Sequence, residues 1–270
     1  MPGLTVTRLA LRAQAVTVSH GSEQVLAEQT LELLPGQAPL GLIGPSGAGK
    51  TSLVEVLAGW RPPTSGVVAL GELNPYNPPR RYRQLVRAAL RGVAEEQDPV
   101  FAQRFKGTYR LSRALQLARR THRKTFTANE LCQLVGYDPA NLNRLMRQTS
   151  LGEQQRLAMA AALASDPDVL ILDEPATALD PAARHSVLAA VVDWACQRGT
   201  AVLLVSHDLD MIESLTSSAL VLVDGHQVAC GRLGGLLSSP AKAHPYLADL
   251  AAIRSAETSA RPSQLRQQQS

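Results

Sequence analysis

GPSGAGKT, residues 44–51, is the stretch of this sequence that decides the fold. It fits the pattern G-x-x-x-x-G-K-[ST] and stands between a short apolar run, PLGLIG (39–44), and a helical pattern, TSLVEVLAGW (51–60). Glycines let backbone N–H groups turn inward around phosphate oxygens, and the start of a helix adds a favourable dipole. The stretch therefore predicts a phosphate-binding loop that joins a buried strand to a helix.

Each residue of this loop has an expected part in holding a nucleoside triphosphate. Lys50 would reach the β- and γ-phosphates, and the Thr51 hydroxyl would bind Mg²⁺. The alternative, a glycine-rich turn with a chance lysine, does not account for the strand before the loop and the helix after it. The residues expected to contact ATP here are Gly44, Pro45, Ser46, Gly47, Ala48, Gly49, Lys50, Thr51 and Ser52.

A second stretch, DVLILDEP (168–175), supplies the acidic half of the expected site. Its apolar run delivers Asp173 and Glu174 to the carboxyl end of a strand, where ligands of open α/β sheets bind. Asp173 suits the Mg²⁺ shell, and Glu174 could polarise the attacking water as general base. Either carboxylate alone could be a solvated strand end. Together with the phosphate loop, they predict a domain that binds a nucleoside triphosphate.

The composition narrows the class of protein. The chain has 270 residues, 45% hydrophobic and 19% charged, which is enough for a full core in one large domain or two lobes. Only 4% of the residues are aromatic, which disfavours a base-stacking surface, and we expect no nucleic-acid partner. The net charge of +4 is mild and does not choose among anionic partners.

The cysteines and the apolar runs indicate a compartment. Cys132, Cys196 and Cys230 are scattered without CxxC pairing, which suits a reducing compartment better than a disulfide framework or a zinc site. The first residues lack the apolar region of a signal peptide, and no run approaches the roughly 20 apolar residues that cross a bilayer. We expect a soluble, cytoplasmic protein.

The patterns along the chain predict an α/β fold. Residues 6–37 indicate an N-terminal antiparallel β region, and the strands and helices that alternate after residue 39 indicate a mostly parallel sheet of the P-loop NTPase type. Between about residues 101 and 146 only helical periodicity is found, which predicts an inserted helical subdomain. The expected divisions are an ATPase core (1–98 and 155–240), a helical subdomain (99–154), and a C-terminal helix with a tail that is disordered from residue 255 (241–270).

The order of motifs resembles the ATP-binding subunits of ABC transporters. The helical insertion is followed by TSLGEQQR (149–156) at the place of the family signature, and then by DEP. Gln97 occupies the Q-loop position, Asp180 the D-loop position and His207 the switch position, all in the expected order. The resemblance covers about residues 9–250. Taken singly, Gln97 would be a surface residue, His207 a capped strand end and Asp180 a helix N-cap before a proline.

The resemblance implies roles for these residues and a pair of subunits. Gln97 would sense Mg²⁺ and a membrane partner, and His207 would contact the γ-phosphate. Two ATPase subunits would pair head to tail, so that Lys50 and Glu174 of one subunit meet the signature of the other. The residues expected to contact the partner's ATP are Ser150, Gly152 and Asp180.

Two positions depart from the family pattern. His20 stands where an aromatic residue commonly stacks on adenine, and it is equally well interpreted as a surface residue. Leu151 replaces the first glycine of the signature, and a positive φ at this position would strain a leucine. The departure predicts an asymmetric pair with a second, different ATPase, in which the site completed by this signature is weakened.

The C-terminal segment resembles one group within the family. SSPAKAHPYLADL (238–250) and VGYDPANLNRL (135–145) are similar to segments of oligopeptide, dipeptide and nickel importer ATPases. This implies two integral-membrane permease subunits, a solute-binding protein that acts indirectly, and a place on the cytoplasmic face of the membrane, with an apolar groove for the permease. His244, Pro245 and Tyr246 could instead form only a turn before a helix. The alternative function is a soluble ABC-type ATPase of a cytoplasmic enzyme complex, of the phosphonate-degradation type.

Overall fold

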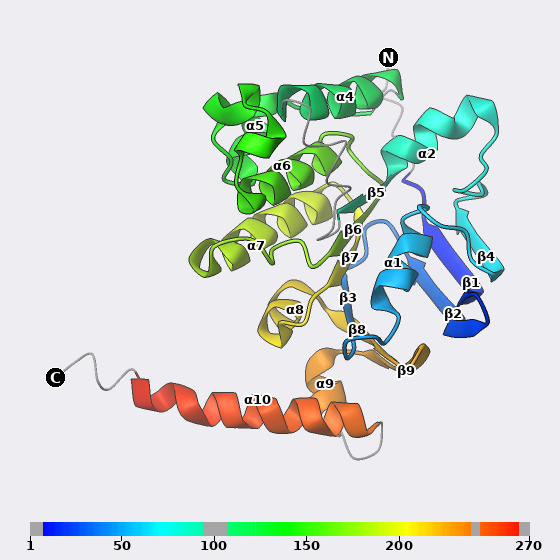
Figure 1. Ribbon diagram of the computed structural model, residues 1–270, viewed down its shortest axis with the longest axis vertical. Coiled ribbons are helices and arrows are strands. Elements are labelled where there is room, and N and C mark those ends of the chain that lie inside the picture. Colours follow the sequence, from blue (N-terminus) through cyan, green and yellow to red (C-terminus); the bar gives the residue numbers. More distant parts are fainter. Residues whose placement is uncertain (1–7, 94–106, 122, 239–243, 265–270) are drawn as a thin grey trace.

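The computed structural model describes residues 8–93, 107–121, 123–238 and 244–264 of the chain. Within these residues two sheets are formed (Figure 1). The first has three antiparallel strands in the order β2–β1–β4, with the bounds β1 (Leu11–His20), β2 (Glu23–Leu33) and β4 (Ser65–Leu70). This confirms the N-terminal antiparallel region that the sequence predicts.

The second sheet carries the strands that end at the candidate site. Its order is β5–β6–β7–β3–β8–β9, with parallel pairing throughout except that β9 runs antiparallel to β8. Its strands are β3 (Leu40–Ile43), β5 (Leu90–Val93), β6 (Val169–Asp173), β7 (Ala201–Val205), β8 (Ser218–Val223) and β9 (His226–Gly231). Both β6 and β7 are buried along their whole length, as expected of apolar strands covered on both faces. The mostly parallel sheet is confirmed.

Two hydrophobic cores lie on opposite faces of this sheet. On one face Leu170 and Leu172 of β6 pack with α6 (Leu151–Leu163) and α7 (Pro181–Gln197). On the other face Val169 and Ile171 pack with α1 (Lys50–Leu57) and the three-stranded sheet. The division follows from the two-residue period of a strand, which sends alternate side chains to opposite faces. Both the phosphate loop and the segment after β6 are thereby anchored in a packed core.

A helical region lies between β5 and β6 (Figure 1). It contains α4 (Gly107–Arg120), α5 (Ala128–Leu134), the 3-10 turns η2 (Pro139–Asn143) and η3 (Met146–Gln148), and α6. Before β5 stand η1 (Arg80–Tyr82) and α2 (Arg83–Ala89). The described residues between β5 and β6 include no strand, which confirms the inserted helical region.

Three further helices are described, one between β7 and β8 and two after β9. They are α8 (Leu209–Leu215), α9 (Leu233–Ser238) and α10 (Pro245–Gln264). The sequence predicts a disordered tail from residue 255 onward. This prediction is wrong for residues 255–264, because α10 continues through them. Ala256, Glu257 and Ala260 are good helix formers, and a polar composition does not by itself exclude a helix. In the described ranges no helix has the length and apolar character needed to span a membrane.

Candidate nucleotide-binding site

Three neighbouring strands end at the same edge of the second sheet, and the expected site residues follow them. β7 lies between β3 and β6. The loop 44–51 follows β3, Glu174 follows β6, and His207 comes two residues after β7. The backbone N–H of Glu174 donates to the carbonyl of Val205 at 3.1 Å, which ties the ends of β6 and β7 together. The topology therefore gathers the loop, the carboxylates and the histidine at one edge.

The Lys50 ammonium group is held by the loop itself. Its Nζ donates to the carbonyl oxygens of Gly44 at 2.8 Å and Pro45 at 2.9 Å. Burial lowers the pKa of Lys50, whereas the charges of Glu174 and Asp173 act in the opposite direction. The lysine is thus electrostatically coupled to both carboxylates. Its position suits an exchange of the two carbonyl oxygens for phosphate oxygens, which are charged and bind an ammonium group more strongly.

Two glycines give the loop its shape. Gly47 and Gly49 have φ of +81° and +95°, a region that residues with a Cβ avoid. A Cβ on Gly49 would lie 2.9 Å from the carbonyl oxygen of Val25, so this glycine is also required by packing. A Cβ on Gly47 would have no atom within 4 Å, and Ser46 beside it is exposed. The tip of the loop is therefore open to a ligand, as a phosphate cradle requires.

The turn between β8 and β9 is hydrogen-bonded to the loop 44–51. The N–H of Gly225 donates to the Ala48 carbonyl at 3.1 Å, and the Ala48 N–H donates to Pro45 at 3.2 Å. The Gly225 carbonyl in turn accepts from Gln29 Nε2 at 2.9 Å, and Gln29 is buried. Sequence reasoning missed Gln29 and Gly225. The only available signal was an Asp-Gly pair typical of a hairpin turn, which says nothing about contact with a loop far away in the sequence.

The two carboxylates after β6 differ in environment. Asp173 is buried at the end of the strand. Glu174 has a φ of +44°, an uncommon conformation for a residue with a side chain, and one that costs free energy. Its Oε2 lies 3.1 Å from Nδ1 of His207. The His207 side chain is 71% exposed, so the ring can reach a ligand at this edge of the sheet.

A small cavity adjoins Glu174 and His207. It has a volume of about 10 Å³, room for about one water molecule, and is lined by Glu174, His207 and Arg184 among others. Arg184 Nε is buried without a hydrogen-bond partner in the described part of the chain. No residue of the loop 44–51 lines this cavity. Arg184 has no motif around it, and sequence reasoning missed it.

Ser150 begins the helix of the expected signature. Its hydroxyl accepts from the N–H of Glu153 at 3.2 Å, and the Glu153 carboxylate accepts from the N–H of Ser150 at 2.8 Å, forming a capping box. Leu151 is the first residue of α6 and does not have a positive φ. The expected strain at Leu151 is therefore absent, because this backbone is helical. The side chain is instead 60% exposed at the start of the helix.

The second glycine of the signature is required by packing. A Cβ on Gly152 would lie 2.7 Å from the carbonyl oxygen of Ala178, two residues before Asp180. The N–H of Ala178 donates to Oε1 of the buried Gln155 at 3.1 Å. These contacts join the start of α6 to the segment before α7. Sequence reasoning missed Gln155, which lies outside the positions that define the signature.

Two other residues that were expected to contact ATP, Asp180 and His20, lie at the surface. Asp180 is exposed and caps α7, with the N–H of Ala182 at 3.5 Å from its carboxylate. His20 is also exposed, at the end of β1, and its Nε2 contacts the guanidinium group of Arg61. Gln97 lies outside the described residues.

The donors available for Mg²⁺ are a hydroxyl and a carboxylate. Thr51 is exposed at the start of α1, and Asp173 ends β6. The described part of the chain has no group of three or more His, Cys, Asp or Glu that could hold a metal. A hydroxyl and a carboxylate fit Mg²⁺, which usually takes its remaining ligands from water and substrate phosphates.

Comparisons with known proteins place this site in a family. A family model described as ABC transporter matches residues 26–177. The probable D,D-dipeptide transport ATP-binding protein DdpF of Escherichia coli (strain K12) is 31% identical over 213 residues, which are 77% of this chain and 63% of that protein. The Nod factor export ATP-binding protein I of Cupriavidus metallidurans is 32% identical over 234 residues, which are 85% of this chain and 73% of that protein.

A solved structure shows the same fold. It is the dimeric structure of a bacterial ABC transporter cassette, with a TM-score of 0.69 and 22% identity, and the match covers 82% of this chain and 98% of that one. The matched family segment contains both the loop 44–51 and the carboxylates after β6. The chain therefore belongs to the ABC transporter family, as one of its ATP-binding and ATP-hydrolysing subunits.

Proposed function

We propose that this ATPase drives the import of a small solute of the peptide, nickel or metal-chelate class. The observation that supports the ATPase site is the gathering of Lys50, Asp173, Glu174 and His207 at one edge of a parallel sheet. Support for transport comes from the family and from relatives named for transport. Relatives that are named for the import of methionine, phosphate and taurine support the direction, and the solute class rests on the C-terminal resemblance alone.

Each residue of the site has its own role in ATP hydrolysis. The backbone of the loop 44–51 and the Lys50 ammonium group hold the phosphates, and Thr51, Asp173 and Gln97 hold Mg²⁺, which would neutralise phosphate charge. Glu174 accepts a proton from the attacking water as general base. His207 contacts the γ-phosphate, and its proximity to Glu174 supports a shared role. His20 packs on the adenine.

The functional unit in this proposal is a pair of ATPases beneath two permeases. Ser150 and Gly152, at the exposed start of α6, complete the partner's ATP site together with Asp180. The partner is a second, different ATPase, and the pair lies on the cytoplasmic face of the membrane through the permease subunits. A solute-binding protein delivers the solute to the permeases. The chain in this proposal divides into a core (1–98 and 155–240), a helical subdomain (99–154) and a C-terminal part (241–270).

The C-terminal motif gives limited support for the solute class. Pro245 begins α10, and Nδ1 of His244 accepts a hydrogen bond from the N–H of Tyr246 at 3.2 Å. This contact is sufficient to explain the three residues as the start of a helix. A soluble ABC-type ATPase of an enzyme complex therefore remains the second candidate function, because its resemblance rests on the same segment.

A capture experiment tests the proposal. Tagged Glu174→Gln protein is incubated with ATP and detergent-solubilised membranes of the source organism, so that blocked hydrolysis holds the closed pair. We expect polytopic membrane subunits and a second ATPase to be recovered, with a Lys50→Ala variant as the control that fails to bind ATP. Recovery of soluble enzymes without membrane subunits would refute the transport proposal and support the second candidate.

A further inference from the structure

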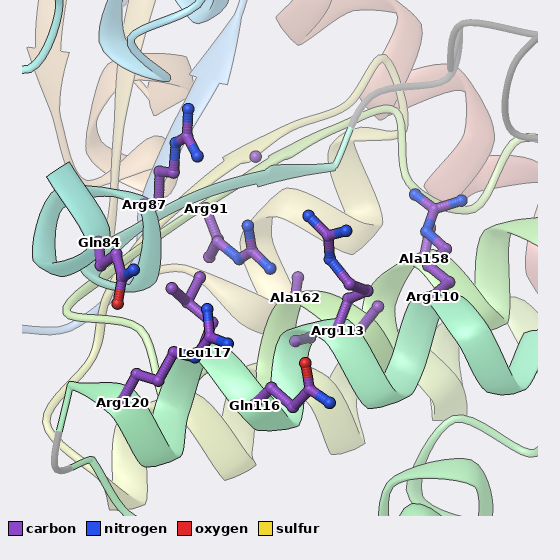
Figure 2. Close-up of a pocket in the computed structure, with 13 residues that line it drawn as sticks. Gln84, Arg87, Arg91, Arg110, Arg113, Gln116, Leu117, Arg120, Ala158 and Ala162 are labelled. Atoms are coloured by element: carbon purple, nitrogen blue, oxygen red, sulfur yellow. The ribbon is translucent and has the colours of Figure 1, made fainter.

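A cavity of about 500 Å³ lies between α2 and β5 on one side and α4 and α6 on the other (Figure 2). An apolar groove was expected next to the helical region, whereas Figure 2 shows Arg110 and Arg113 on the side of α4 that faces Arg91. None of the described residues that line this cavity belongs to the nucleotide site. The cavity of about 10 Å³ beside Glu174 and His207, in contrast, touches the expected catalytic residues directly.

This small cavity lies between the segment that carries the expected base and the segment that carries the histidine. Its lining comes from residues 174–177 after β6, from Arg184 and Leu188 of α7, from residues 206–208 after β7, and from Met211 of α8. All of these residues are within the described ranges. A volume of about 10 Å³ has room for about one water molecule. The space therefore suits a single bridging water between the two segments.

Polar groups in this lining have hydrogen-bonding capacity that the described residues do not use. Nε of Arg184 is buried and has no acceptor in the described part of the chain. The hydroxyl of the buried Ser206 accepts from the N–H of Asp208 at 3.1 Å, which leaves its own proton to donate. Oε2 of Glu174 faces His207, and Oε1 has no hydrogen-bond partner among the described residues. A buried water takes about two to four such partners, so these groups are sufficient to hold one.

The Glu174 backbone is held more firmly than its carboxylate. The N–H of Glu174 donates to the Val205 carbonyl, and the Glu174 carbonyl accepts from Thr177 Oγ1 at 3.0 Å. These bonds hold a residue whose φ of +44° costs free energy. A general base must keep its carboxylate within reach of the water that it activates, and a misplacement of about 1 Å can slow a reaction by on the order of 10²-fold. A further contact at the carboxylate would therefore serve catalysis.

We propose that Arg184 is a positioning residue for the Glu174–His207 pair. Its Nε–H donates to one water molecule in the cavity, and this water donates to the Glu174 carboxylate and accepts from the Ser206 hydroxyl. A bridge is required because Arg184 Nε makes no direct hydrogen bond to these groups. The loop 44–51 does not line the cavity, and we assign this water a positioning part and not a nucleophilic one. The assignment rests on the proposed role of Glu174 as general base.

Substitutions of Arg184 separate the N–H donor from the positive charge. In Arg184→Gln the amide nitrogen occupies the place of the arginine Nε, so that a donor is kept and the charge is lost. Arg184→Lys keeps the charge but has a methylene group at that place. Arg184→Met has neither a donor nor a charge there. All these variants keep an aliphatic stem, so packing against the neighbouring side chains changes little.

Steady-state ATP hydrolysis by the full-length protein in its assembled pair is the first measurement. We expect Arg184→Met and Arg184→Lys to lower kcat by on the order of tenfold while KM for ATP stays unchanged, because a positioning contact is lost and ATP binding is not. Arg184→Gln should restore most of this loss, to within about threefold of the wild-type rate. A crystal structure of the wild type should show the water, and a structure of Arg184→Met should not.

The Glu174→Gln variant distinguishes this proposal from the proposed function. If Glu174→Gln hydrolyses ATP at the wild-type rate, the base is another group and the proposed mechanism fails. If Glu174→Gln is slow but Arg184→Met is not, only the role of Arg184 is overturned. In the Glu174→Gln background, Arg184→Met should cause no further loss, because both act on the same carboxylate.

Other results would also overturn the role of Arg184. Equal rate losses in the glutamine, lysine and methionine variants would mean that the donor is not the feature that matters. A raised KM for ATP in Arg184→Met would place the residue in nucleotide binding. A wild-type crystal structure without water in the cavity would remove the bridge.

Discussion

Nδ1 of His207 lies 3.1 Å from Oε2 of Glu174, although the two residues stand on different strand ends and are separated by helix α7 in the sequence. The contact exists because β6 and β7 are adjacent parallel strands whose ends are tied through the Glu174–Val205 backbone hydrogen bond. The carboxylate expected to act as a base and the imidazole expected to contact phosphate are thus a physical pair. Substitution of either residue should change the surroundings of the other side chain.

Glu174→Gln should separate ATP binding from hydrolysis. The amide keeps the size of the side chain but cannot take a proton from water, so we expect the hydrolysis rate to fall by about 10²–10⁴-fold. ATP affinity should change little, and ATP should now cause a stable pair that light scattering detects. Hydrolysis at the wild-type rate would show that the base is another group.

His207→Ala should also slow hydrolysis while ATP binding is retained, by roughly 10²-fold. Because His207 and Glu174 are in contact, the effects of their substitutions should not add. The double variant His207→Ala/Glu174→Gln should therefore hydrolyse ATP about as slowly as Glu174→Gln alone. Fully multiplicative rate losses, measured by phosphate release, would contradict a coupled pair.

Substitution of Leu151 distinguishes side-chain bulk from backbone strain. The helical backbone at this position requires no glycine, but the exposed side chain stands where a partner's nucleotide is expected. Leu151→Ala and Leu151→Gly should therefore raise ATP hydrolysis by similar factors of a fewfold, measured in the assembled pair. A gain for glycine alone would restore the strain explanation, and no gain for either would remove the idea of a weakened site.

Gly152→Ala should lower the free energy of unfolding by about 1–3 kcal/mol, because the added Cβ would lie 2.7 Å from a backbone oxygen that cannot easily move. Gly235→Ala is the matched control, since its Cβ would meet no atom within 4 Å and its φ is not positive. Urea unfolding should show the control unchanged or slightly more stable. Equal effects at both positions would mean that the α6–Ala178 contact is loose.

The buried Cys132 gives a pH-dependent prediction. Burial, and secondarily the charge of Asp138, raise the pKa of the Cys132 thiol from 9.0 to about 11. Between these values the folded protein keeps the proton and the unfolded chain loses it, so this contribution to stability falls as the pH rises from 9 to 11. Relative to Cys132→Ala, the wild type should lose about 2 kcal/mol across this window in urea unfolding. A constant difference between the two would contradict the shift.

Local patterns in the sequence were sufficient to predict most of the fold. Strand β6 is a run of apolar residues flanked by charged ones, and the loop 44–51 carries glycines where φ is positive, so both follow from short-range stereochemistry. The helical insertion follows from periodicity. The tail was misjudged because a polar composition does not by itself exclude a helix, and α10 continues to Gln264.

Contacts between distant segments were decided only by the tertiary structure. The Gly152–Ala178 approach, the support of Ala48 by Gly225, and the meeting of Glu174 with His207 each join residues whose spacing in the chain carries no common pattern. A sequence motif records what one segment needs for its own backbone, but the distance between two segments depends on how the sheet orders its strands and how the helices pack on it.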